Sequence, residues 1–244
     1  MTRILVFSPH PDDETLGCGG TIAKRIKEGF DVYVVFMTDG RNSHKYYYYP
    51  PPEKLKTLRR REALNALKIL GVPKENIVFL DFEDGSLACH IPQAARKVED
   101  LLLQIKPTEA FIPYEGDKHV DHRATSLIAL YCIKKIKLPV RIYEYPIYKD
   151  INGTYRENIN IELKTRAINS YKSQIKLLFS SQDRPILSDN FLQRFRRSEE
   201  VFKEGRKEHH IKTFLKLFYL HWVERFKKPF RDRMEILKLK LLNN

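Results

Sequence analysis

The sequence predicts an α/β protein with a Rossmann-like three-layer fold, in which a mostly parallel sheet lies between helices, followed by a helical C-terminal extension. Three observations predict this fold. Short apolar runs alternate with amphipathic segments through the first 145 residues, the connections between them are short, and glycine or proline stands at several segment ends. Such alternation is typical of parallel strands joined by right-handed crossovers.

The expected elements follow from local pattern, taken in chain order. Strands are predicted where short runs are rich in apolar and β-branched residues, at residues 4–7, 31–37, 77–80, 109–113 and 140–145. Helices are predicted where apolar residues recur every three or four positions and the run stops at Gly29, at Gly71 or before Pro107. They cover residues 16–28, 54–70, 91–105 and 120–136.

Length and composition limit the class of protein. A chain of 244 residues with 42% hydrophobic and 11% aromatic residues has enough apolar material for a sizeable core. We divide it into a main domain, residues 1–190, and a basic helical extension, residues 191–244. Three widely spaced cysteines argue against a disulfide framework, and no apolar run reaches the length of a membrane span. We therefore expect a cytoplasmic protein, either free or peripheral at the inner membrane surface.

The turn after the first strand, SPHPDDE, carries the first chemical signal. Prolines stop the strand, and in an open α/β sheet the carboxyl ends of the strands are where ligands bind. One interpretation is a solvated acidic turn that caps the next helix. The other is a metal site, because His10 and Asp13 are three residues apart and both are ordinary zinc ligands. The glycines that follow fit a dinucleotide fingerprint poorly, since Ile22 stands where its last glycine belongs.

A second strand end supports the metal interpretation. The predicted strand 109–113 leads to HVDH at residues 119–122, just before a helix. With His10, Asp13 and His122 as ligands, the site would hold two imidazoles and one carboxylate and would leave a position open for water, as catalytic zinc sites do. The roles that remain are a general base for Asp12, an oxyanion stabiliser or proton donor for His119, and, for Asp121, orientation of an imidazole, with His119 as the expected partner and its charged form favoured.

The motifs PHPDDE, GCGG and HVDH, in this order and each near a strand end, resemble those of the PIG-L/LmbE-like family of zinc-dependent N-acetylglucosaminyl de-N-acetylases. The resemblance covers roughly residues 1–180 and includes TDG at 38–40, Arg59-x-x-Glu62 and YKSQ at 171–174. It implies a hydrolase that removes acetyl from an N-acetylated amino sugar or glycoconjugate with Zn²⁺ or another divalent metal. It also implies the following residue roles: His10, Asp13 and His122 as metal ligands, Asp12 as base, His119 at the oxyanion, and Arg59 at the substrate.

Some features depart from this resemblance or leave alternatives open. An exposed arginine on a helix is often simply solvated, which is the alternative for Arg59. The insertion YYYYPPP at 46–52 and the residues beyond about 190 are expected to shape the rim of the substrate pocket. Two activities remain open. The protein removes acetyl from an N-acetylated amino sugar, or it hydrolyses the amide bond of a non-sugar substrate.

The basic C-terminal part suggests partners. The net charge is +13, and residues 203–240 hold twelve Lys or Arg against five Asp or Glu. The spacing of the apolar residues predicts a helix with one apolar face, formed by Ile211, Phe214, Leu215, Phe218 and Trp222. We expect this face to pack on the main domain. The alternatives are an interfacial helix on anionic lipid, a face that forms a homo-oligomer, and attraction of an anionic or lipid-linked substrate. Nucleic acid is not expected, because the charge forms no recognised binding motif.

Overall fold

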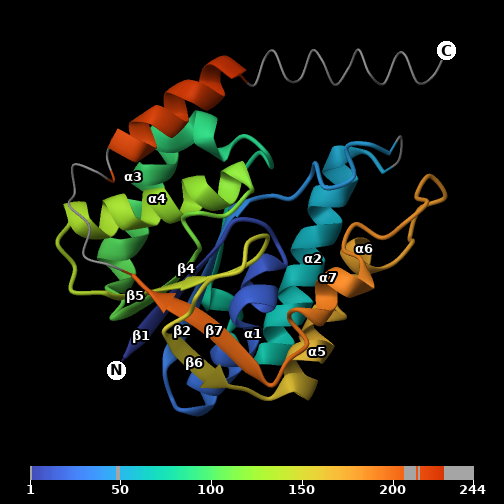
Figure 1. Ribbon diagram of the computed structural model, residues 1–244, viewed down its shortest axis with the longest axis horizontal. Coiled ribbons are helices and arrows are strands. Elements are labelled where there is room, and N and C mark those ends of the chain that lie inside the picture. Colours follow the sequence, from blue (N-terminus) through green and yellow to red (C-terminus); the bar gives the residue numbers. More distant parts are fainter. Residues whose placement is uncertain (1, 48–49, 206–212, 214, 228–244) are drawn as a thin grey trace.

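The computed structural model describes residues 2–47, 50–205, 213 and 215–227, and Figure 1 shows their arrangement. The described residues form a seven-stranded sheet in the order β3-β2-β1-β4-β5-β7-β6. Its strands are β1 (Arg3–Ser8), β2 (Asp31–Thr38), β3 (Ile77–Phe82), β4 (Glu109–Pro113), β5 (Arg141–Tyr145), β6 (Tyr155–Asn158) and β7 (Glu199–Glu204). The α-helices with complete bounds are α1 (Asp13–Lys27), α2 (Pro52–Leu70), α3 (Ile91–Ile105), α4 (Val120–Lys135), α5 (Ile161–Ile168), α6 (Lys172–Ile175) and α7 (Asp189–Gln193).

The centre of the sheet is the pair β1 and β4. Strand β1 pairs in parallel with β2 on one side and with β4 on the other, so that Ile4 lies between Val32 and Glu109. The chain runs outward from β1 in both directions, and the strand order therefore reverses between β1 and β4. In open α/β sheets the crevice at the carboxyl ends of such strands is the usual ligand site.

Helices cover both faces of the sheet. Helices α1, α2 and α5 pack on one face, and α3 and α4 pack on the other (Figure 1). Strand β1 contributes to both cores, with Ile4 and Val6 in the first apolar cluster and Leu5 and Phe7 in the second. Burial on both faces explains why this strand reads as a continuous apolar run.

The predicted fold class is confirmed, and each predicted strand and helix is present with ends within three residues of those expected. The largest difference is at α1, which begins at Asp13 and not at residue 16. Acidic residues in a first turn interact favourably with the helix dipole, so the acidic turn and the helix overlap. Strands β6 and β7, which no pattern predicted, are antiparallel additions at the edge beside β5.

Strand β7 is held to the core by a buried charge. The carboxylate of Glu200 accepts hydrogen bonds from the backbone N–H groups of Gly20 and Thr21, at 2.9 and 2.8 Å. Lys164 of α5 pairs with the same carboxylate at 2.6 Å, and both side chains are buried. Strand β7 lies beyond residue 190 yet belongs to the sheet. The division into 1–190 and 191–244 stays a prediction.

Residues 215–227 form a helix beside α3 and α4 (Figure 1). The expectation that its face with Leu215, Phe218 and Trp222 packs on the domain is wrong, since these side chains are 57%, 59% and 56% exposed. The helix packs instead through Leu217 and Leu220, which join the second apolar cluster. A helix with two apolar stripes can bury only one of them against a flat layer. Ile211 and Phe214 lie outside the described residues.

Candidate metal centre

Three side chains from the ends of β1 and β4 converge on one point. His10 Nδ1 lies 3.0 Å from Asp13 Oδ2, His122 Nε2 lies 3.2 Å from the same oxygen, and the two imidazole nitrogens are 3.3 Å apart. All three residues are buried. His10 and Asp13 are more than a hundred residues from His122 in the chain, and the switch point of the sheet brings them together.

Local structure explains these positions. Asp13 is the first residue of α1, and its carboxylate also accepts the backbone N–H of His10 at 3.0 Å, which closes the turn after β1. His122 lies in the first turn of α4, whose N-cap is His119. Each ligand candidate is therefore held by a strand end and a helix start, not by a free loop.

The donor atoms fit a divalent cation. Tetrahedral zinc with bonds of about 2.0–2.1 Å has ligand atoms roughly 3.3 Å apart, close to the observed separations. A metal-binding imidazole is neutral, and in that state the two carboxylates that face His10 Nε2 place the remaining proton on this nitrogen. The lone pair of His10 Nδ1 then points to the same space as His122 Nε2 and Asp13 Oδ2. A cation bound there would remove the repulsion between these three electron-rich atoms. Among the described residues, His119, Asp84 and Asp121 also have donor atoms within reach of this cluster.

Carboxylates hold the far side of both imidazoles. His10 Nε2 lies 3.1 Å from Asp84 Oδ1 and 3.2 Å from Asp121 Oδ2, and His122 Nδ1 lies 3.6 Å from Asp117 Oδ1. Such outer carboxylates fix the tautomer and orientation of metal-binding histidines. Burial acts to lower the pKa of His10, but Asp84, Asp121 and Asp13 raise it well above its ordinary value. The pKa of His122 is raised to about 9, because Asp13 and Asp117 outweigh burial.

Asp84 and Asp117 were missed by the sequence reasoning. Asp84 follows the end of β3, so the strand-end argument used for β1 and β4 would have found it. The expected role of Asp121 needs correction. Its carboxylate contacts His10 and accepts the backbone N–H groups of Gly85 and Leu87, at 2.6 and 3.1 Å, and it does not orient the ring of His119.

His119 is neutral rather than charged. Burial, together with the neighbouring His10 and His122, lowers its pKa to about 4. Its Nδ1 accepts the backbone N–H of Asp121 at 3.2 Å, which leaves Nε2 to carry the proton. The His119 ring lies 4.7 Å from the His10 ring, centre to centre, and 6.1 Å from the ring of Tyr148. This arrangement offers a neutral N–H donor beside the metal candidate site.

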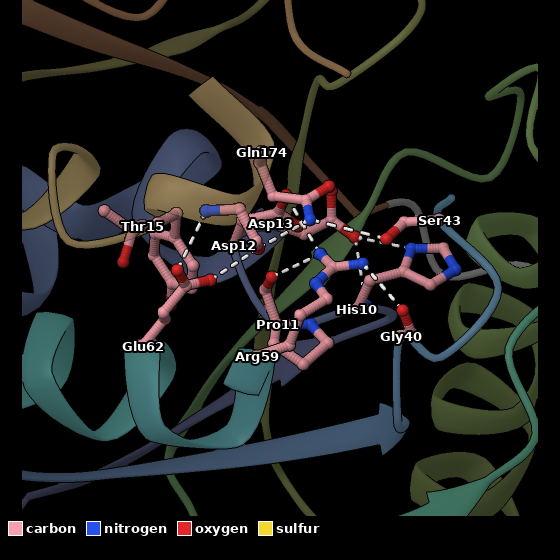
Figure 2. A network of polar contacts seen from close by, with 12 residues as sticks. His10, Pro11, Asp12, Asp13, Thr15, Gly40, Ser43, Arg59, Glu62 and Gln174 are labelled. Atoms are coloured by element: carbon pink, nitrogen blue, oxygen red, sulfur yellow. Dashed lines mark hydrogen bonds and ion pairs between the residues drawn. The ribbon is translucent and has the colours of Figure 1, made fainter. Parts of the chain in front are cut away.

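Arg59 is buried and faces Asp12, as Figure 2 shows. Its guanidinium lies 3.0 Å from Asp12 Oδ2 and donates to the carbonyls of Pro11 and Gly40, at 2.5 and 3.3 Å. The alternative of an exposed, solvated arginine is therefore wrong, while its contact with substrate stays a prediction. Burial, helped by the charge of Asp13 and opposed by that of Arg59, raises the pKa of Asp12 to about 7.

Comparison with known proteins agrees with this geometry. The family model described as GlcNAc-PI de-N-acetylase, PIG-L, matches residues 5–133, which include all of the converging side chains. The chain belongs to the PIG-L family. It is a metal-dependent deacetylase of that family, also called LmbE-like, and the family is zinc-dependent.

Relatives extend the match beyond residue 133. The diacetylchitobiose deacetylase of Thermococcus kodakarensis is 28% identical over 194 residues, covering 71% of this chain and 70% of that protein. The solved structure of the conserved protein TT1542 from Thermus thermophilus is similar with a TM-score of 0.67 and 26% identity, over 86% of this chain and 97% of that one. The N,N'-diacetylchitobiose deacetylase of Pyrococcus horikoshii, at 24% identity and a TM-score of 0.68 over 84% of each chain, shows the same fold.

The remaining PIG-L-like motifs support the turn that carries Asp12. Asp12 has φ of 142°, which L residues rarely adopt, and its backbone N–H donates to Glu14 Oε2 at 3.1 Å. Tyr171 of YKSQ donates to the same carboxylate, and Ser173 donates its N–H to Glu62 at 2.8 Å. Glu14 is thus committed to protein groups, and strain at Asp12 is held by its surroundings, as is common at functional sites.

A cavity of about 380 Å³ opens beside the site of this PIG-L chain. It is lined by Tyr148, Arg184, Pro185, Ile186, Leu187, Ser188 and Phe191. The ring of Tyr148 lies 5.3 Å from that of His122, so one residue of the cavity lining also borders the metal candidate site. Two contacts join its rim to the segment before α2, from His44 Nε2 to Gln182 at 3.1 Å and from Tyr47 to Asp183 at 2.9 Å. The role of the 46–52 insertion stays a prediction, and residues 48–49 lie outside the described part.

Proposed function

We propose that this protein removes the acetyl group from an N-acetylated amino sugar of the N-acetylglucosamine type, with His10, Asp13 and His122 holding zinc. The observation that carries the proposal is the grouping of a carboxylate, Asp12, and a neutral imidazole, His119, around one set of metal donors. Membership of the PIG-L family supports the reaction, and the relatives named as diacetylchitobiose deacetylases support an acetylated sugar.

A bound zinc ion would act as a Lewis acid and bring the pKa of water toward 7. Asp12 accepts the proton of the attacking water, because it is next to the ligand Asp13 and Arg59 holds its carboxylate in place. His119 Nε2–H donates to the oxygen that becomes negative as the water adds to the amide carbonyl. A neutral ring suits this role, since its proton position is set by the backbone N–H of Asp121.

The carbon–nitrogen bond then breaks as the nitrogen takes up a proton. Asp12 holds the proton taken from water at this stage, and the low pKa of His119 favours Asp12 as its donor. Acetate and the free amino sugar are the products. The cavity beside Tyr148 and Phe191 provides aromatic surface for the sugar or for the group attached to it. Arg59 is proposed to contact substrate next to Asp12.

The choice of zinc rests on chemistry and family. Two imidazoles and one carboxylate also suit other divalent ions, so the ion should be identified by activity after exchange. The protein stripped with a chelator should regain activity with Zn²⁺, and the order of activity among Zn²⁺, Co²⁺, Fe²⁺ and Mn²⁺ decides the assignment.

The test is acetate release from a panel of N-acetylated amino sugars, mono- and disaccharide, alongside N-acetylated amino acids. We expect acetate from at least one sugar, loss of it with chelator, and loss of it in Asp12→Asn. Hydrolysis confined to the non-sugar amides would reject the sugar and keep the amide chemistry.

A further inference from the structure

The helix at residues 215–227 turns a second apolar stripe away from the protein. Leu215, Tyr219, Trp222 and Phe226 are 57%, 67%, 56% and 66% exposed. Their spacing of four, three and four residues places them on one side of a helix. The rings of Trp222 and Phe226 lie 5.1 Å apart, so these two members of the stripe pack against each other. Large contiguous apolar patches on a surface mark contact sites.

The opposite side of the helix is fixed to the catalytic edge. Leu217 and Leu220 are buried in the apolar cluster formed with α3 and α4. His221 Nδ1 contacts the carbonyl of Ala88 at 2.8 Å, and Lys216 pairs with Glu115 at 2.6 Å. Ala88 follows Leu87, whose N–H holds Asp121, and Glu115 begins the loop that leads to His119. The helix that carries the outward stripe is therefore attached to two segments that also hold residues of the site.

Charge decides which partner suits the stripe. Arg225 and Lys227 are exposed on the same helix, and the sequence from 228 to 240 adds five Lys or Arg against two Asp or Glu. The whole chain carries +13. Trp and Tyr favour the interfacial region of a bilayer, and basic residues beside an apolar stripe are attracted to anionic lipid headgroups. A second copy of a chain with this charge would be repelled.

We propose that the helix at 215–227 is an interfacial membrane-binding element that lies in the surface of a bilayer containing anionic phospholipid. Leu215, Tyr219, Trp222 and Phe226 enter the boundary between headgroups and acyl chains, while Arg225 and Lys227 contact phosphate. Within the part of the chain that the structure describes, no helix is long and apolar enough to cross a membrane. The contact places the catalytic edge next to the lipid surface, whichever amide is cleaved.

Trp222, the only tryptophan of the chain, reports the contact directly. The full-length protein is titrated with vesicles of phosphatidylcholine alone and with vesicles containing about 30% phosphatidylglycerol, and Trp222 emission and co-sedimentation are followed. We expect a saturable blue shift and co-sedimentation with the anionic vesicles, and weaker binding in roughly 0.5 M NaCl because salt screens the charges. An unchanged emission spectrum with all of the protein left in the supernatant would overturn the proposal.

A variant pair localises the binding. Tyr219→Ser/Phe226→Ser keeps Trp222 as reporter and should need at least tenfold more anionic lipid for half-maximal binding. Leu103→Ser on α3, a site 53% exposed, is the matched control and should bind as the natural protein does. Equal lipid demand in all three proteins would refute the assignment to this helix.

Two further outcomes are informative. If sedimentation velocity without lipid shows a dimer that Tyr219→Ser/Phe226→Ser dissociates, the stripe is an interface between copies and the membrane proposal is wrong. Acetate release from a water-soluble acetylated sugar should be equal in the double variant and the natural protein. Vesicle binding without acetate release from any sugar would reject the proposed function alone, and acetate release without vesicle binding would reject the membrane contact alone.

Discussion

The carboxylate of Asp12 lies 3.0 Å from the guanidinium of Arg59, and both side chains are buried beside the ligand candidate Asp13 (Figure 2). Arg59 thus holds the Asp12 carboxylate in place, and Asp12 is not one of the three metal ligand candidates. This relationship separates the group that moves a proton from the groups that hold the ion, and substitutions can test the two functions independently.

Asp12→Asn should lower kcat by about 10²–10⁴-fold, because an amide cannot accept the proton of water. Its metal content should stay at that of the natural protein, since none of the three ligand candidates is changed. Acetate release and metal analysis on the same sample measure both. Turnover at the natural rate would show that another group is the base.

His122→Ala should lose the metal, because it removes one of three protein ligands. Asp84→Asn should keep the ligands but weaken zinc affinity by about 10–100-fold, since His10 Nε2 loses a carboxylate at 3.1 Å. Competition with a zinc chelator measures both affinities. Asp183→Asn, at the rim, is the control and should bind zinc as the natural protein does. Normal zinc affinity in His122→Ala would disprove the ligand set.

Two ion pairs with glutamates of β7, one buried and one exposed, allow their contributions to stability to be compared. Lys164→Met should cost about 3–5 kcal/mol of unfolding free energy, because it leaves the buried Glu200 without its cation. Arg156→Met breaks the exposed pair with Glu199 and should cost less than about 1 kcal/mol. Urea denaturation of both variants measures the difference. Equal costs would contradict the structural role given to Lys164.

The sequence predicted the fold and the ligand candidates because both depend on local pattern plus one topological rule. The carboxyl ends of parallel strands lie at one edge of a sheet, so the residues that follow β1 and β4 were expected to lie close together. His10, Asp13 and His122 could therefore be grouped without coordinates. The same rule applied to β3 would have included Asp84. The burial of Arg59 could not be predicted, because it depends on Pro11 and Gly40, which are distant in the chain.

Other errors have a geometric origin. The partner of Asp121 depends on the backbone of residues 85 and 87, which turns its carboxylate toward His10 and away from the His119 ring. The C-terminal helix has apolar residues at helical spacing on two sides, and spacing alone does not say which side faces the protein. The roles assigned to individual site residues stay predictions until the variants above are measured.

His44 should make the folded protein less stable in mild acid. Burial and the charge of Arg59 together lower the pKa of His44 to about 4, whereas an unfolded chain has the ordinary value of about 6.5. Between these values the unfolded chain binds a proton that the folded chain does not, so stability falls as the pH drops from about 6.5 toward 4. The ring contacts Ser43 and Gln182, and His44→Gln removes the titration while keeping a polar side chain. Urea unfolding of metal-free protein should show the natural chain losing about 1–2 kcal/mol more than His44→Gln between pH 7 and 5. Comparing the two proteins cancels the other titrating groups, so parallel stability curves would show that His44 takes up its proton without unfolding.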